Sequence, residues 1–199
     1  GSPREITIVA LGRLTDVALA LSLEPRFAQS VARIVVMGGA VYVPGNVSPV
    51  ASANLYEDPE SAAIVYTSGA PLVQVGLDVC NKVHISQSQL EQIKQADTPT
   101  TRLLSAAAPS LQRSYVERGL LVEGDGVRYN DLPAVAFMVD PDQFGCSEMF
   151  VEIEIHSSTA RGQTVAQHIG QGPSRPNVTV CLEVDGERAA ALFTERLIG

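Results

Sequence analysis

The sequence predicts an α/β protein built on a mostly parallel, Rossmann-like sheet flanked by helices. Short apolar runs rich in β-branched residues alternate with segments whose apolar residues recur at helical spacing. The runs show little polar alternation, as expected of parallel strands that are covered on both faces. The chain has 199 residues, of which 45% are hydrophobic, so it is long enough to bury one sizeable core. We therefore treat residues 1–199 as a single domain.

The first eighty residues predict the order strand, helix, strand, helix, strand. The strands are expected at 6–11, Arg33–Met37 and 71–79. The first helix should cover 14–23, with Thr15 and Asp16 near its start, where they can cap the helix or meet the positive end of its dipole. The second should cover 59–66, with Asp58 as its cap. This alternation indicates a right-handed parallel sheet whose ligands bind at the carboxyl ends of the strands.

The rest of the chain predicts further helices and two more strands. Two helices are expected within 86–117, with an interruption near 97–101, and a short helix is expected at 131–138. Strands follow at 149–155 and 178–184, and an amphipathic helix at 186–197 closes the chain.

The charge of the chain argues against several kinds of partner. The sequence has 14 basic and 22 acidic residues, a formal net charge of −8. This balance disfavours binding to nucleic acid or to anionic membranes. No apolar run approaches the roughly 20 residues needed to span a bilayer, and the pattern of a secretory signal is missing. We therefore expect a cytoplasmic protein.

The three cysteines do not form a recognisable motif. Cys80, Cys146 and Cys181 are an odd set without Cys-x-x-Cys spacing, so the sequence indicates neither a disulfide framework nor a zinc site. Buried, reduced thiols are the expectation.

Residues 39–56 are the natural candidate for a site. This stretch is rich in Gly, Pro, Asn and Ser, and a loop of this length is uncommon unless it is functional. Its residues, together with three other motifs, resemble the nucleoside hydrolases of the inosine-uridine preferring type. The four motifs, which occur in the family's order, are Ala10-Leu11-Gly12-Arg13-Leu14-Thr15-Asp16, Val36-Met37-Gly38-Gly39-Ala40, the block 46–60, and Gly76-Leu77-Asp78-Val79. Residues 161–164 and 176–178 add a resemblance to the family's C-terminal region.

The resemblance implies hydrolysis of the N-glycosidic bond of purine or pyrimidine ribonucleosides to base and ribose, a step of nucleoside salvage. Breaking that bond builds positive charge on the sugar, as in other glycosyl transfers. The family uses a calcium ion, which can orient the ribose hydroxyls and lower the pKa of the attacking water. The implied partner is thus a small-molecule nucleoside.

Two calcium ligands follow from the resemblance. Asp131 stands where the family has a calcium-binding aspartate, and Leu11 stands where a backbone carbonyl binds the metal. From the residues alone, an aspartate before a helix is more often a cap. Both interpretations of Asp131 remain open at this stage.

Four substrate-binding positions follow in the same way. Asn46 and Asn54 match asparagines that hydrogen-bond the sugar, and an amide can donate and accept together. In a loop rich in Gly and Pro, an asparagine can instead support a turn. Ser52 stands where the family has a glutamate, and Asn130 where a histidine is often found. Serine is shorter than glutamate, and asparagine cannot act as an acid near neutral pH.

The family's opening motif, Asp-x-Asp-x-x-x-Asp-Asp, does not occur in this sequence. That motif supplies further calcium ligands and the general base, so no catalytic base is assigned and calcium binding by this chain alone should be weak. We expect the chain to match the C-terminal two-thirds of the family's fold, without its N-terminal strands. The first strand should then be an exposed apolar edge that a second copy or a complementing chain could cover. The alternative is a noncatalytic homologue or fragment that binds a nucleoside-like ligand or a partner chain.

Overall fold

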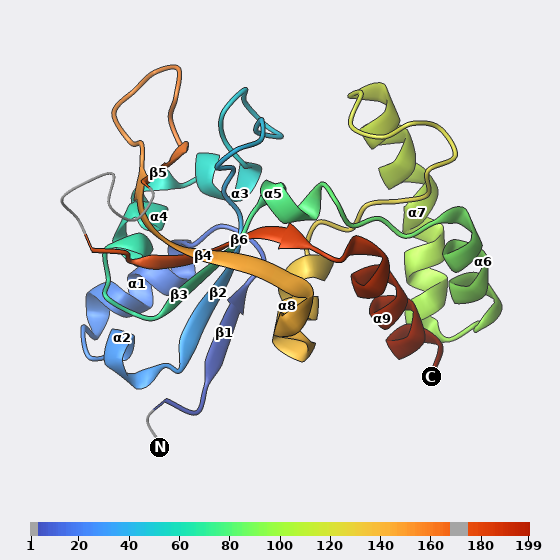
Figure 1. The fold of residues 1–199 in the computed structure, drawn as a ribbon, viewed down its shortest axis with the longest axis horizontal. Coiled ribbons are helices and arrows are strands. Elements are labelled where there is room, and N and C mark those ends of the chain that lie inside the picture. The colour runs from blue at the N-terminus through green and yellow to red at the C-terminus, as the bar shows by residue number, and fades with distance from the viewer. Residues whose placement is uncertain (1–3, 168–174) are drawn as a thin grey trace. The chain divides into compact units, whose positions relative to one another are not determined.

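The computed structural model describes residues 4–167 and 175–199. The chain forms two compact units, which are described in turn. The first contains residues 1–79 and 144–183, and the second contains residues 80–143 and 184–199. The ribbon in Figure 1 is coloured along the chain and labels the elements.

The first unit carries the strands and the shorter helices. The strands are β1 (Thr7–Ala10), β2 (Arg33–Met37), β3 (Leu72–Val75), β4 (Phe144–Ile153), β5 (Thr164–Gln167) and β6 (Val178–Val184). The helices are α1 (Thr15–Leu23), α2 (Phe27–Ser30), α3 (Ala53–Tyr56) and α4 (Pro59–Tyr66), and α5 (Leu77–Cys80) follows at the boundary between the units.

The sheet has the order β1-β2-β3-β6-β4-β5. The pairs β1–β2, β2–β3 and β3–β6 are parallel, and the pair β4–β5 is antiparallel. Figure 1 shows β1, β2 and β3 side by side. The predicted class, a mostly parallel α/β sheet with helices, is confirmed. Strand β1 lies at the edge of this sheet with its four residues half-buried, and 67% of the surface of Ile6 is exposed beside it.

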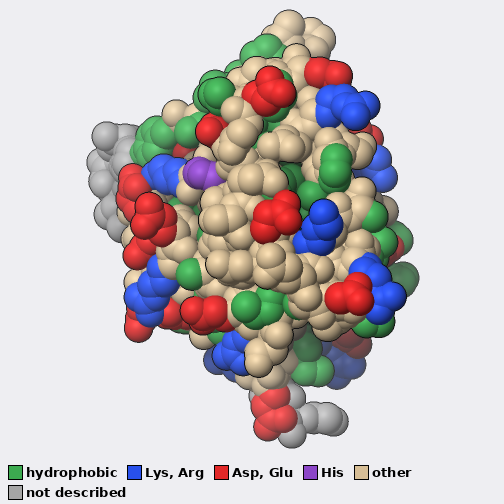
Figure 2. Space-filling model, turned by 90° about the vertical axis from the view of Figure 1, so that its right-hand side faces the viewer, with side chains coloured by type: hydrophobic (Ala, Val, Ile, Leu, Met, Phe, Trp, Pro, Cys, Tyr) green, Lys and Arg blue, Asp and Glu red, His purple; other side chains and the backbone are tan. Residues whose placement is uncertain are grey.

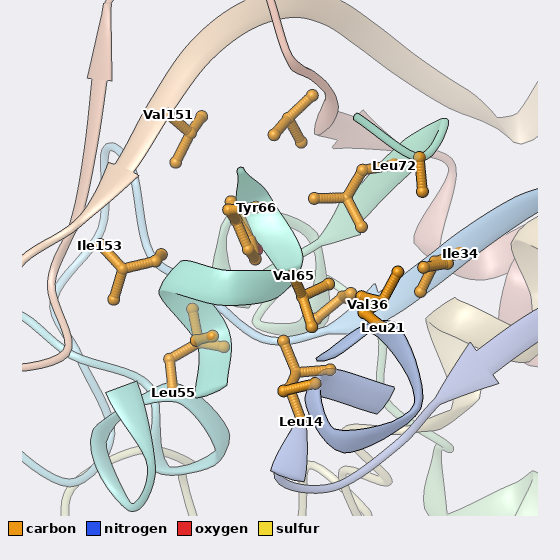
Figure 3. Close-up of a cluster of buried hydrophobic side chains, with 14 of the residues drawn as sticks. Leu14, Leu21, Ile34, Val36, Leu55, Val65, Tyr66, Leu72, Val151 and Ile153 are labelled. Atoms are coloured by element: carbon orange, nitrogen blue, oxygen red, sulfur yellow. The ribbon is translucent and has the colours of Figure 1, made fainter. Parts of the chain in front are cut away.

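One hydrophobic core fills the space between the sheet and the helices α1 and α4. Figure 3 shows Leu21 of α1 and Val65 of α4 directed toward Ile34 and Val36 of β2. The two helices pack against each other. Small inward residues, such as Ala62 of α4, allow this close approach, and each large aliphatic side chain buried here contributes about 1.5–3 kcal/mol.

The third predicted strand is shorter than expected. We predicted it over 71–79, but β3 ends at Val75 and residues 77–80 form helix α5. A Cβ atom on Gly76 would lie 2.8 Å from the carbonyl oxygen of Gly39, so two backbones cross closely here. Asp78 then accepts hydrogen bonds from the N–H groups of Val41 and Tyr42, at 2.9 and 2.8 Å, which draws the chain out of the strand.

The second unit is helical. It contains α6 (Gln87–Gln95), α7 (Pro99–Glu117), α8 (Leu132–Val139), a short 3-10 turn (Pro141–Gln143) and α9 (Gly186–Ile198). Capping boxes at Ser86 and Thr98 start α6 and α7, so the predicted interruption near 97–101 is confirmed. Asp185 caps α9 by accepting the N–H of Arg188.

None of the helices within residues 4–167 and 175–199 combines the length and apolar character needed to cross a bilayer. Figure 2 shows acidic and basic side chains interspersed over the face in view, without a broad basic patch there.

Candidate functional site

The candidate site in the first unit begins where the chain leaves β2. Gly39 has φ +90°, and a Cβ atom there would lie 2.6 Å from the side-chain amide of Gln74. Gln74 is itself buried and accepts a hydrogen bond from the hydroxyl of Tyr66 at 2.8 Å. Only glycine therefore fits at this turn. The turn directs the following loop over the carboxyl ends of the strands.

Ser52 is part of this turn. Its side chain is buried, and its Oγ accepts the N–H of Gly39 at 2.7 Å. The residue stands before α3, a single helical turn that the sequence did not reveal within the loop at 39–56. The structure therefore gives the Ser52 hydroxyl a backbone partner, whereas its predicted contact with a sugar stays a prediction.

Asn46 sits in a tight turn. The N–H of Asn46 donates to the carbonyl oxygen of Ala51 at 3.1 Å, and the hydroxyl of Ser48 accepts the N–H of Ala51 at 3.1 Å. A Cβ atom on Gly45 would lie 2.2 Å from the Ala51 carbonyl oxygen, so the turn depends on glycine. The Asn46 Oδ1 accepts the N–H of Ala53 at 2.8 Å. The turn-supporting role that the sequence left open is thus present.

Asn54 joins the ends of two parallel strands. Its Nδ2 donates to the carbonyl oxygen of Leu11, at 3.1 Å, and to that of Met37, at 2.9 Å. Both donor hydrogens are used, whereas no described residue donates to its Oδ1. The carbonyl oxygen of Leu11 has two lone pairs, and the hydrogen bond from Asn54 occupies one of them. The structure thus brings together Leu11 and Asn54, two residues that the resemblance assigned to one site.

The neighbouring acid Asp58 accepts hydrogen bonds from two other residues of the protein. Asp58 accepts the N–H of Ser61 at 3.1 Å and also the hydroxyl of Thr15, so it caps α4 as predicted. The Thr15 hydrogen bond, followed by the Ser61 bonds, holds the pKa of Asp58 below its ordinary value. Helix α1 begins after Leu14 without a side-chain cap, so the capping role offered for Thr15 and Asp16 is wrong, whereas Asp16 does lie in the first turn, at the positive end of the helix dipole.

In the second unit, Asp131 precedes α8 but does not cap it. Its side chain makes no capping hydrogen bond. Pro133, in the first turn, lacks an N–H, which removes one of the two donors that a cap would use. Although the residue is exposed, atoms packed around the carboxyl remove part of its water and raise its pKa. The alternative interpretation of Asp131 as a cap is therefore wrong, and its carboxyl accepts no hydrogen bond from the described residues.

The side-chain amide oxygen of the adjacent Asn130 lacks a hydrogen-bond donor among the described residues. Its Oδ1 is buried and has no hydrogen-bond partner among the described residues. Its backbone carbonyl accepts the thiol of Cys80 at 3.3 Å, which fixes the chain at this point. A buried polar atom without a partner costs about 1–3 kcal/mol, so a ligand that donates to Oδ1 would recover that free energy. Such an atom marks a site that a donor can complete.

Sequence reasoning missed Arg128, which organises the segment before Asn130. The guanidinium donates to the Asn81 Oδ1 at 2.9 Å and to the Leu120 carbonyl oxygen at 3.1 Å, and it lies 5.6 Å from the centre of the Tyr115 ring. The side chain is buried, which lowers the pKa of Arg128. A single arginine in a glycine-containing segment gave no signal in the sequence.

The residues described do not make a complete calcium site. Residues 4–167 and 175–199 contain no group of three or more His, Cys, Asp or Glu side chains that could hold a metal ion. The two ligands expected from the sequence are one carboxyl, Asp131, and one carbonyl, Leu11. Calcium takes six to eight oxygen ligands, so these donors alone do not fit the ion, and calcium remains a proposal.

Two solved nucleoside hydrolase structures share this fold. A plant nucleoside hydrolase, PpNRh1, is 34% identical with a TM-score of 0.90, and the match covers 99% of this chain and 63% of that one. A purine-preferring ribonucleoside hydrolase from Gardnerella vaginalis is 27% identical with a TM-score of 0.89, over 99% and 61% of the two chains. The class defined by the sheet and its loops is therefore that of a nucleoside hydrolase.

The sequence comparisons give the family. The model of the inosine-uridine preferring nucleoside hydrolases matches residues 1–191, and the chain belongs to this family. The pyrimidine-specific ribonucleoside hydrolase RihA of Klebsiella pneumoniae is 33% identical over 196 residues, which are 98% of this chain. The chain spans 62% of the length of that relative. The family predicted from the four motifs is confirmed.

Proposed function

We propose that this chain acts in the hydrolysis of the N-glycosidic bond of ribonucleosides to free base and ribose. Its membership of the nucleoside hydrolase family supports this activity. One relative is named as pyrimidine-specific and one similar structure as purine-preferring, so the proposal covers both classes of base. We place the reaction in cytoplasmic nucleoside salvage.

The observation that carries the proposal is the position of Asn54. Its amide nitrogen holds the carbonyl oxygens of Leu11 and Met37, at the carboxyl ends of β1 and β2. Ligands of parallel α/β sheets bind at these strand ends. Because both hydrogens of the amide are used inside the protein, Oδ1 has a fixed direction. It is suited to accept a hydrogen bond from a ribose hydroxyl.

Asn130 and Asp131 extend the proposal to the second unit. The Asn130 Oδ1 needs a donor, which a hydroxyl or a nucleobase N–H can supply. The Asp131 carboxyl makes no capping hydrogen bond to α8. By the family resemblance, the Leu11 carbonyl and the Asp131 carboxyl would supply two of the ligands of a calcium ion, which when bound would lower the pKa of the attacking water. The remaining ligands and the general base are assigned to no residue of this chain.

In the proposed reaction, Asn54 and Asn130 bind and orient the nucleoside, whereas they do not complete the proton transfers. Hydrolysis adds hydroxide from water to the sugar C1′ and returns a proton to the departing base. Asn130 has an amide where the family often has a histidine, and an amide does not donate a proton near neutral pH. The leaving base therefore has to obtain its proton from solvent or from another group.

The second candidate is a noncatalytic homologue that binds a nucleoside-like ligand or a partner chain. Three observations favour it. The Ser52 hydroxyl is already engaged by Gly39, and Asn130 replaces an acid. The exposed edge of β1, with Ile6 beside it, offers backbone groups to an added strand from a second copy or a complementing chain.

One assay separates the two candidates. Purified protein is incubated with uridine, inosine or adenosine plus calcium, and free ribose is measured. If the chain is an enzyme, ribose is released, a chelator abolishes the release, and Asp131→Ala lowers its rate at least about 100-fold. Losing even a supporting group of a metal site costs about 10–100-fold in metal affinity or activity. Asp142→Ala, which removes an exposed carboxyl of the same unit, should leave the rate unchanged.

The noncatalytic candidate predicts no ribose release. It also predicts a rise in melting temperature with uridine or inosine, which Asn54→Ala removes. The absence of both ribose release and a thermal shift would contradict the enzyme and the nucleoside-binding form of the second candidate, and would leave only its partner-chain form.

A further inference from the structure

Two cysteines face each other across β4 and β6. The Sγ atoms of Cys146 and Cys181 are 3.0 Å apart. Neighbouring contacts establish the register of these strands: the Thr179 hydroxyl donates to the Glu148 carboxylate at 2.5 Å, and a Cβ atom on Gly145 would lie 3.0 Å from the Glu183 Cβ. Residue numbers fall along β4 as they rise along β6, so the two strands are antiparallel here.

This register suits a disulfide. Directly opposite residues of antiparallel strands have Cα atoms about 4.5–5.5 Å apart, within the range of about 4.4–6.8 Å found for disulfides. The observed separation of the sulfur atoms exceeds an S–S bond by only about 1 Å. A small rotation of the side chains therefore suffices to form the bond.

The two thiols differ in accessibility and reactivity. Cys146 is exposed, whereas Cys181 is buried. The expectation that all three cysteines are buried is therefore wrong for Cys146, which lies on a stretch of β4 that is open to solvent. The hydrogen bond from Cys181 lowers the pKa of Cys146, because it stabilises the thiolate, although burial and the charge of Glu148 oppose this effect. Exposed thiolates are the reactive form of cysteine.

We propose that Cys146 and Cys181 form a reversible disulfide when the protein meets a small-molecule disulfide such as oxidised glutathione. The Cys146 thiolate attacks one sulfur of oxidised glutathione, and one reduced glutathione leaves. Cys181 then loses its proton and attacks the Cys146 sulfur, which releases the second glutathione. The two protein thiols lose two electrons and two protons in total, and one oxidised glutathione becomes two reduced molecules.

The cross-link fastens β4 to β6 and closes the segment between them. That segment includes the antiparallel partner β5, so the bond ties the antiparallel part of the sheet to its parallel part. The oxidised protein should be more stable, because the bond removes conformational freedom from the unfolded chain. The proposal is independent of the hydrolase activity.

The test uses the purified chain and oxidised glutathione. After treatment, one portion is measured by intact mass, and in a second portion the remaining thiols are alkylated before peptide mapping. The expected result is a loss of two hydrogen atoms in mass, one cross-linked peptide containing Cys146 and Cys181, and a melting temperature higher by about 5–10 °C. A reducing agent should reverse all three changes.

Variants provide the controls. Cys80→Ser, which leaves the pair intact, should behave as the wild type. Cys181→Ser should retain one glutathione on Cys146, because no second thiol can displace it. If the wild-type protein keeps a stable glutathione on Cys146, or if both thiols remain open to alkylation, the proposal is overturned. The wild-type result decides the matter even where a variant does not fold.

Discussion

Asp58 joins two helices of the first unit, and its removal should cost much of the stability of the fold. It caps α4 by accepting the N–H of Ser61 and also accepts the hydroxyl of Thr15 at the start of α1. The cap contributes about 1 kcal/mol. The hydrogen bond from Thr15 to a charged acceptor contributes about 1.5–3 kcal/mol. Asp58→Ala should therefore lower the free energy of unfolding by about 2–4 kcal/mol.

The pKa of Asp58 gives the expected pH dependence. Because the folded-state pKa lies below the unfolded value of about 3.9, the charged carboxylate stabilises the fold above that value. Its contribution is lost as the pH falls through the depressed folded-state pKa. The difference between wild type and Asp58→Ala should thus be full at pH 7 and shrink below about pH 4.

Urea unfolding, followed by circular dichroism at pH 7 and at pH 3, measures both effects. Thr15→Val should reproduce the loss of the hydroxyl contact alone and cost less than Asp58→Ala. Asp16→Ala, which removes an exposed acid one residue further on, should change stability by less than about 0.5 kcal/mol. Equal stability of Asp58→Ala and wild type at pH 7, or a difference that grows in acid, would refute the reasoning.

Three further predictions concern single side chains. Ser52→Ala should cost about 1–3 kcal/mol in urea unfolding, because the buried Gly39 N–H loses its acceptor; an unchanged midpoint would contradict this. Burial raises the folded-state pKa of Asp131, so its stabilising contribution is complete below the unfolded pKa and disappears as the pH rises through the folded value. Asp131→Asn should accordingly gain stability relative to wild type as the pH rises from 3 to 7, whereas a relative loss would count against it. Asn177→Ala removes hydrogen bonds to the Val151 N–H and carbonyl oxygen, at 2.8 and 3.0 Å, and should lower the melting temperature by several degrees while ribose release per folded molecule stays constant.

The long periodic elements of the fold could be predicted from the sequence. Strand β2 was predicted with its observed bounds, Arg33–Met37, and helix α4 was predicted from its cap and first-turn proline. The four-residue elements α2, α3 and β5 were not, because their residues form no continuous apolar run of the kind that marks the equally short strands β1 and β3. The end of β3 depends on a contact between Asp78 and a distant loop, which no local pattern contains.

The candidate site could be predicted only in part. The resemblance pointed to Leu11 and Asn54, and their contact across 43 positions of the chain follows from the parallel pairing of β1 and β2. The unsatisfied oxygen of Asn130 could not be foreseen, because burial of one amide atom depends on tertiary packing. The absence of a cap at Asp131 could be foreseen in principle, since Pro133 lacks the N–H that a cap prefers.

The most direct measurement is the rate of ribose release from uridine and inosine by the wild-type chain with calcium, compared with Asn54→Ala at matched folded concentration. If the strand-end amide holds the ribose, the wild-type protein releases ribose and the variant loses about tenfold in kcat/KM, the equivalent of one hydrogen bond. Equal rates for the two proteins would contradict the assignment of Asn54. The absence of release from the wild type would contradict hydrolysis by this chain.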